Sequence, residues 1–264
     1  MKLLFVSIPQ IAKAFSSNSK VTFLYVLFRL WYFAITRKLK LIQNDFTLHV
    51  VYNGKDLTFY LQNVMDIAVL REVFVDLEYA WIPTVNPRII IDLGAHFGDT
   101  ALYYHARFPE ATIIAVEPSP ENFCRLKMHT KHIDKIVCVQ AAVGSSNGKI
   151  VLNLMDSSLG HSVMNRAGTS SSVEVSQVTL PQLLSMCDVS KADLVKFDVE
   201  GAEFGLFSDE IRAENISNAY IGEIHNDLNE NNLPPIETWF KKFTLSKLPI
   251  NEKRYVLMAV TSNS

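Results

Sequence analysis

Cysteine is scarce in this chain of 264 residues, which contains only Cys124, Cys138 and Cys187. The three lie far apart and form no Cys-x-x-Cys pair, so neither a disulfide framework nor a cysteine zinc site is expected. Dispersed thiols are typical of a reducing compartment, and we expect a cytoplasmic protein. An excess of basic residues is also missing, because the formal net charge is -2. Nucleic-acid binding, which needs clustered lysine and arginine, is therefore not predicted.

A long uncharged apolar run is absent as well. Pro9 interrupts the short run at the N-terminus, which makes residues 1–9 a poor secretory signal. The most apolar stretch, residues 21–36, carries Arg29 at its centre, whereas a spanning helix needs about 20 apolar residues without a central charge. We predict a helix that packs on the domain or on a second copy of the chain. Peripheral membrane contact through residues 21–40 is the alternative.

The chain divides into two predicted parts. Residues 1–85 form a helical and hairpin extension: residues 46–61 alternate apolar and polar side chains around Asn53-Gly54, which favours a type I′ turn. Residues 66–79 have helical spacing with Asp66 as a plausible cap. Residues 86–264 alternate short apolar strands with helices. This rhythm predicts an α/β domain with a doubly wound, mainly parallel sheet.

Several elements of the second part can be placed from local signals. Residues 88–94, 111–118 and 135–144 are expected strands. Ser119-Pro120-Glu121 has the cap residue, proline and early acid that open a helix. The last strands, within residues 243–260, are expected to form an antiparallel hairpin.

A glycine turn follows the first of these strands, in the motif IIDLGAHFGDT. Gly94 lets the chain turn, Gly98 lets the next helix come close, and the helix N-terminus offers unpaired N–H groups. Glu117 ends the next strand, near the separation expected for an acid that binds a ribose. Together these features indicate a nucleoside ligand; the structural alternative is a turn beside an exposed strand-end acid.

The turn lacks the middle glycine that a dinucleotide pyrophosphate requires, because His96 occupies that position. S-adenosylmethionine has no phosphate, and Asp92 at the end of the strand suits its ammonium group. The sequence therefore fits S-adenosylmethionine better than NAD. A Walker loop is excluded, because no Gly-Lys-Ser/Thr follows.

Two further groups of residues carry potential chemistry. In KFDVEGAEF, the acids Asp198, Glu200 and Glu203 crowd the end of a strand and the start of a helix. They could stabilise the helix dipole, bind substrate hydroxyls, act as a base or hold a divalent cation. Their spacing is not a clear ligand pattern, so no metal site is predicted. In GEIH, alternation places Glu223 and His225 on one side of a strand, where they could form a general base.

These motifs together resemble the FkbM family of S-adenosylmethionine-dependent methyltransferases, over about residues 88–225. The resemblance implies a class I, Rossmann-like methyltransferase fold and O-methylation of a small hydroxylated molecule or glycan sugar. It implies that Asp92, Gly94 and Gly98 frame the methionine end of the cofactor. Glu117 would then bind the ribose, with Gln140 and Ala141 near the adenine. The expected cofactor-binding residues are Asp92, Gly94, His96, Gly98, Thr100, Glu117, Pro118, Gln140, Ala141 and Asp198.

For catalysis we nominate His225 as the base, assisted by Glu223, with Asp198 or Glu200 as the alternative. His161, in a serine-rich loop, could close over the substrate. Two competing functions are an NAD-dependent oxidoreductase, which the His96 loop disfavours, and a non-catalytic methyltransferase-like partner in a glycan-synthesis complex. A homo-oligomer is a further expectation.

Overall fold

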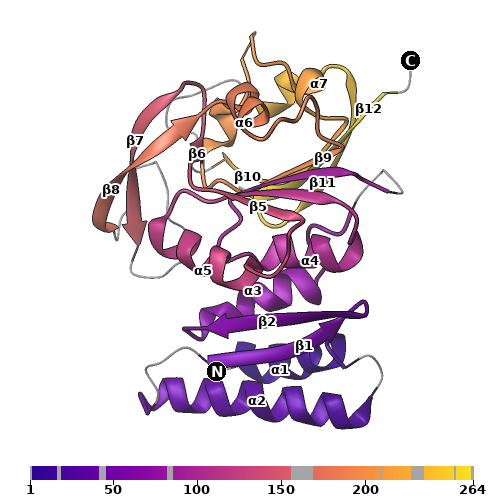
Figure 1. Ribbon diagram of the computed structural model, residues 1–264, viewed down its shortest axis with the longest axis vertical. Coiled ribbons are helices and arrows are strands. Elements are labelled where there is room, and N and C mark those ends of the chain that lie inside the picture. Colours follow the sequence, from indigo (N-terminus) through magenta and orange to yellow (C-terminus); the bar gives the residue numbers. More distant parts are fainter. Residues whose placement is uncertain are drawn as a thin grey trace.

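A seven-stranded sheet forms the centre of the protein, with strand order β11-β12-β10-β9-β3-β4-β5 (Figure 1). The structure is a computed structural model and describes residues 2–16, 19–41, 46–81, 86–155, 169–208, 210–226, 235–252 and 254–262. The sheet comprises β3 (Ile89–Leu93), β4 (Thr112–Val116), β5 (Ile136–Val139), β9 (Leu194–Phe197), β10 (Ala219–His225), β11 (Phe243–Pro249) and β12 (Arg254–Thr261). β12 lies antiparallel between β10 and β11, and the pairs among β10, β9, β3, β4 and β5 are parallel. The predicted parallel sheet with a C-terminal antiparallel hairpin is confirmed.

Both faces of this sheet are buried, as expected for a doubly wound fold. Along β3 and β4, Ile90 and Ile113 join one apolar cluster, while their neighbours Ile91 and Ile114 join the other. The first cluster also contains α3 (Met65–Phe74), α4 (Asp99–Arg107) and α5 (Pro120–Thr130); the second contains α6 (Leu180–Met186) and α7 (Ala213–Ile216). The 3-10 helices η1 (Ala202–Gly205) and η3 (Ile236–Phe240) add to the second cluster. Ser119 caps α5 as predicted, accepting a hydrogen bond from the Asn122 backbone N–H.

The expected single strand over residues 135–144 is two strands. β5 ends at Val139, and the chain leaves the central sheet at the exposed Gln140. It then pairs as β6 (Ala142–Val143) in a separate sheet with β7 (Gly148–Met155) and β8 (Thr169–Val178). The two strands have different partners: among the described strands β5 pairs with β4 alone, whereas β6 pairs in parallel with Gln177 and Val178 of β8.

The N-terminal extension packs beneath the central domain (Figure 1). It comprises α1 (Lys2–Ala14), α2 (Lys20–Lys38), the hairpin strands β1 (Phe46–Tyr52) and β2 (Lys55–Leu61), and α3. Asn53 and Gly54 both have positive φ, which confirms the predicted turn. Pro9 lies inside α1 and does not end it, because the buried Ile8, Ile11 and Ala12 pack that helix against the rest of the extension. The extension and the sheet share one apolar cluster, and the boundary at residue 85 stays a prediction.

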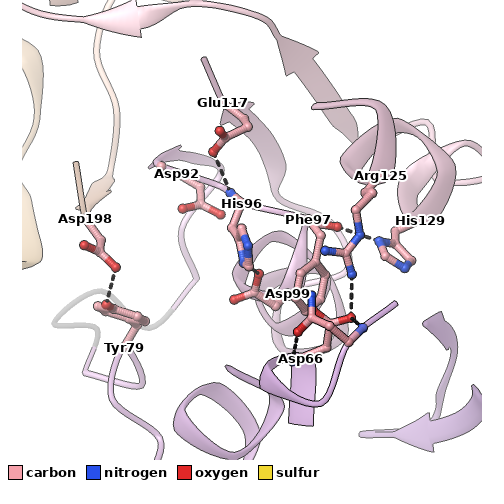
Figure 2. A network of polar contacts seen from close by, with 12 residues as sticks. Asp66, Tyr79, Asp92, His96, Phe97, Asp99, Glu117, Arg125, His129 and Asp198 are labelled. Carbon is pink, nitrogen blue, oxygen red and sulfur yellow. Dashed lines mark hydrogen bonds and ion pairs between the residues drawn. The ribbon is translucent and has the colours of Figure 1, made fainter. Parts of the chain in front are cut away.

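The helix expected over residues 66–79 is shorter, because it ends at Phe74. Asp66 is also not its cap: Val64 holds that position without a side-chain bond. Instead Asp66 reaches back to accept hydrogen bonds from the backbone N–H groups of Gln62 and Asn63. The same carboxylate pairs with Arg125 of α5 at 2.8 Å, and both side chains are buried (Figure 2). A buried ion pair thus joins the extension to the central domain.

Candidate functional site

A pocket opens at the carboxyl ends of β3, β4 and β9, the edge where doubly wound folds bind ligands. The space within it is about 950 Å³ when the open solvent at its mouth is included. The predicted site residues on its wall are Gly94, His96, Glu117, Pro118, Ala141, Asp198 and Glu200. The predicted residues outside the wall are Asp92, Gly98, Thr100, Gln140, Glu223 and His225.

The loop after β3 forms one side of the pocket. The backbone N–H groups of Gly94 and Ala95 both donate to the carbonyl of Val116, which holds the loop against β4. His96 has a φ of 49°, so it takes the left-handed conformation that glycine normally adopts. Glu200, across the pocket, has a φ of 52°. Strained backbone at two wall residues is typical of functional sites.

Glu117 lies at the end of β4 with its carboxylate facing this loop (Figure 2). It accepts hydrogen bonds of 2.9 Å from the backbone N–H groups of His96 and Ser119. Burial raises the pKa of Glu117 to about 7, although His96 and these hydrogen bonds oppose the rise. Because the pKa is raised on folding, the contribution of Glu117 to stability falls as the pH rises from about 4.5 to about 7. A ligand that donates hydrogen bonds to the ionised carboxylate would offset this loss.

Asp92, which we expected to meet the cofactor, does not line the pocket. Its carboxylate is fully buried and pairs with the ammonium group of Lys196 at 3.1 Å. Lys196 Nζ also donates to the carbonyl of Gly94 at 2.9 Å, and lies 5.0 Å from the centre of the Tyr79 ring. The ion pair of Asp92 and Lys196 therefore stabilises the loop that contains Gly94. Sequence patterns assigned no role to Lys196, because only the pairing of β3 with β9 brings it to Asp92.

Gly98, Thr100 and Gln140, which we also expected to bind the cofactor, lie outside the pocket wall. Gly98 precedes α4, where a side chain would meet Leu126 of α5. Thr100 is buried in the first turn of α4. Gln140 is exposed at the break between β5 and β6, while its neighbour Ala141 reaches the pocket. The turn after β5 therefore contributes one small apolar side chain.

Acidic side chains converge on His225 at the carboxyl ends of β9 and β10. Nδ1 of His225 is hydrogen-bonded to Glu203, and both side chains are fully buried. Nε2 lies 3.4 Å from Glu223 Oε1 and 3.5 Å from Glu200 Oε2. Asp198 and Glu200 lie at the pocket wall, with His225 behind them. The structure thus brings together the predicted catalytic residues, but only the two nominated as alternatives line the pocket.

The protonation of this cluster bears on the nominated base. Burial lowers the pKa of His225, but the hydrogen bond to Glu203 and the nearby carboxylates raise it to about 9. Burial and the carboxylate of Asp198 raise the pKa of Glu223 to about 8. His225 therefore carries a proton at neutral pH and lacks the free lone pair that a general base needs.

The extension supplies a wall that sequence patterns did not reveal. Val69, Glu72, Val73 and Tyr79 all line the pocket. The hydroxyl of Tyr79 donates to Asp198 Oδ2 at 3.2 Å (Figure 2). Burial and nearby acids raise the pKa of Glu72 to about 7. These residues come from a part of the chain without recognisable motifs, and only tertiary packing places them here. The predicted loop containing His161 lies outside the described residues.

Comparison with known proteins gives a family match over residues 92–244, to the methyltransferase FkbM domain. Methyltransferase 1 of Beauveria bassiana is 24% identical over 155 residues, which cover 50% of this chain and 62% of that protein. Hexuronic acid methyltransferase AglP of Haloferax volcanii is 26% identical over 141 residues, or 52% of this chain and 56% of that protein. The chain thus matches less than two thirds of the length of either relative.

Solved structures with similar chains include a fibrillarin/Nop5p complex, with 16% sequence identity and a TM-score of 0.48. The alignment covers 83% of this chain and 98% of the other. A precorrin-6y C5,15-methyltransferase from Geobacter metallireducens has 10% identity and a TM-score of 0.42, with coverage of 76% and 89%.

Proposed function

Since this chain belongs to the FkbM methyltransferase family, we propose that it transfers a methyl group from S-adenosylmethionine to a hydroxyl group of a small molecule or glycan sugar. The observation that carries the choice of cofactor is the charge of the pocket. Its acidic wall residues are Glu72, Asp99, Glu117, Asp198 and Glu200. Lys196 is the one lysine among the described residues of the wall, and it is already paired with Asp92. Such a wall suits the sulfonium and ammonium groups of S-adenosylmethionine and disfavours the pyrophosphate of NAD.

The residues fit this cofactor in three further ways. Glu117 offers a carboxylate to the ribose hydroxyls, and Lys196 fixes the Gly94 carbonyl in the loop proposed to hold the methionine end. When bound, S-adenosylmethionine supplies an electrophilic methyl group. Ala141, Val143 and Leu152 provide an apolar surface for a flat ring. The name of the Haloferax volcanii relative, a hexuronic acid methyltransferase, supports a sugar as the acceptor.

The acidic wall is where we propose that the acceptor hydroxyl binds. An alcohol has a high pKa, so its proton must leave as the C–O bond forms. Carboxylates of this wall can receive it, and they include Glu72 as well as Asp198 and Glu200. Tyr79 orients Asp198 through its hydroxyl, and His225 positions Glu200 from behind. In this mechanism His225 is a positioning residue, in place of the base that we first nominated.

The first test is calorimetric titration with S-adenosylhomocysteine at pH 8 and pH 6, with NAD in parallel. Only the ionised form of Glu117 accepts hydrogen bonds on both oxygens, and its pKa is about 7. We expect binding about tenfold tighter at pH 8 than at pH 6, because the ionised fraction changes by that factor. NAD should give no saturable heat.

The Glu117→Gln variant is the matched control, since it keeps the shape of the side chain but cannot ionise. It should bind S-adenosylhomocysteine about tenfold more weakly at pH 8, with little change at pH 6. Binding of NAD in place of S-adenosylhomocysteine would overturn the proposal in favour of an oxidoreductase. Binding of neither compound would overturn it in favour of a non-catalytic module.

We also propose that α2 contacts an anionic membrane surface. Its exposed apolar residues recur every three or four positions and form one stripe: Val21, Leu24, Tyr25, Phe28, Tyr32, Ile35 and Leu39. The Arg29 side chain is not part of this stripe. It donates to the Thr47 carbonyl and lies 4.3 Å from the centre of the Phe46 ring, so it contacts the hairpin. None of the helices among the described residues has the length and apolar character needed to cross a bilayer.

The positive charge of α2 favours an anionic membrane over a second copy of the chain as the partner of this stripe. Residues 19–41 contain no Asp or Glu, and Arg37, Lys38 and Lys40 cluster at one end. Two copies packed on this stripe would bring only like charges together, whereas anionic headgroups complement them.

Sedimentation with vesicles of phosphatidylcholine and phosphatidylserine tests this contact. The Phe28→Glu variant, at a side chain that is 68% exposed, should bind at least about tenfold more weakly than the wild type. The Met186→Glu variant changes an exposed residue on α6 and should bind normally. Equal binding by all three proteins, or a dimer that Phe28→Glu dissociates, would contradict a membrane partner.

A further inference from the structure

The cluster at the carboxyl ends of β9 and β10 has the geometry of a cation site. One ligand atom each from Asp198, Glu200 and His225 lies within 4.8 Å of the other two. Atoms at this spacing can all reach a common ion at about 2.0–2.4 Å after small adjustments of their side chains. The sequence spacing predicted no metal site, because Asp198 and Glu200 meet His225 only through the pairing of β9 with β10.

The orientation of His225 is an independent observation that indicates a ligand. Glu203, which is fully buried, is hydrogen-bonded to Nδ1 and so directs Nε2 towards Glu200 and Glu223. Histidines that bind metals almost always donate their other ring N–H to a carboxylate or carbonyl in this way. A bound cation takes the place of the proton on Nε2.

A hydrogen bond from a neighbouring side chain also orients Asp198. Tyr79 donates to its Oδ2, whereas its buried Oδ1 accepts no hydrogen bond from any residue that the structure describes (Figure 2). A buried carboxylate oxygen without a donor is costly unless a cation or ligand meets it.

The negative charge around His225 also favours a bound cation. The carboxylates of Asp198, Glu200, Glu203 and Glu223 surround a single imidazole. Among the described residues, two basic side chains lie near: Lys196 is paired with Asp92, and Arg254 Nη1 lies 3.8 Å from Glu223 Oε1. Oxygen ligands with one imidazole nitrogen suit Mn²⁺, which accepts both.

We propose that Asp198, Glu200 and His225 bind a divalent cation of the Mn²⁺ type, positioned by Glu203, at the acceptor side of the pocket. Because Asp198 and Glu200 line the pocket, the remaining coordination positions face it. This inference rests on the proposed function and narrows its substrate class. Acceptors would carry two adjacent oxygen atoms that can bind the cation together, such as a sugar diol or a hydroxy acid.

The test is Mn²⁺ binding to the chelator-treated full chain, followed by electron paramagnetic resonance without any acceptor. We expect one saturable Mn²⁺ per chain and a hyperfine coupling to one histidine nitrogen. Glu200→Gln and Asp198→Asn should each weaken binding at least about tenfold, and Glu203→Gln by about 10–100-fold. His225→Gln should abolish the nitrogen coupling.

The Glu174→Gln variant removes an exposed carboxylate from β8 and should leave Mn²⁺ binding unchanged. The wild-type result stands even where a variant fails to fold: no saturable Mn²⁺, or Mn²⁺ without nitrogen coupling, overturns the site. S-adenosylhomocysteine titration of the same proteins separates the two proposals. Cofactor binding without Mn²⁺ rejects only the cation site, and Mn²⁺ without cofactor binding rejects the methyltransferase function.

Discussion

The Gly94→Ala variant should lose about 4 kcal/mol or more of folding free energy, because a left-handed backbone and an overpacked contact add their costs. Gly94 has a φ of 73°, and a Cβ atom there would overlap the carbonyl oxygen of Asp198 and lie 3.0 Å from its carbonyl carbon. The clash is with the backbone of Asp198, directly after β9, and backbone atoms cannot rotate away as a side chain can. Urea unfolding followed by circular dichroism measures the loss, and S-adenosylhomocysteine binding should disappear with it.

Gly54 provides a matched control for this substitution. Its φ of 75° is nearly the same, but a Cβ atom there meets nothing within 4 Å. The Gly54→Ala variant should therefore lose only about 1 kcal/mol, the cost of the left-handed conformation alone. Equal losses in the two variants would show that the close approach of the loop to β9 does not require glycine.

The second large effect is expected for Arg125→Met. This change leaves the Asp66 carboxylate, 1% exposed, without its ionic partner. Breaking a buried pair in this way typically costs about 3–5 kcal/mol. Arg125 also lies 4.5 Å from the centre of the Phe97 ring, which methionine can still contact. Urea unfolding should show a lower midpoint, with the extension losing protection in hydrogen exchange together with α5.

Lys149→Met gives the comparison for an exposed pair. Lys149 and Glu174 are 2.6 Å apart, but the side chains are 70% and 58% exposed. Exposed pairs of this kind contribute little, so no measurable change in the unfolding midpoint is expected. If Arg125→Met proved as mild as Lys149→Met, the docking of the extension would depend on apolar packing alone.

The half of the pocket wall formed by the loop after β3 and by Glu117 was predictable because its signals are local. A strand, Gly94 and the helix at Asp99 follow one another in the chain, and Glu117 ends the next strand. Parallel neighbours end at the same edge, so sequence order alone brings these groups together. The Asn53-Gly54 turn was predictable for the same reason, since two residues fix its geometry.

The remaining half depends on contacts between distant parts of the chain. Lys196 belongs to a motif that we recognised, yet its role follows from the pairing of β9 with β3. Tyr79 lies 119 residues from its partner Asp198. Asp66 resembled a helix cap because local patterns cannot show Arg125. Similarly, no pattern reveals that Glu203 rather than Glu223 holds Nδ1 of His225.

The mixed origin of the pocket wall has an evolutionary consequence. Val69, Glu72, Val73 and Tyr79 precede residue 86, whereas the loop after β3, Glu117 and Asp198 follow it. The family match begins at residue 92 and so leaves the first group outside. Mutations in the extension can therefore change these side chains without changing any residue that the family match covers. Under the proposed function, acceptor preference would then diverge between descendants of one ancestral enzyme while their methyl donor remained the same.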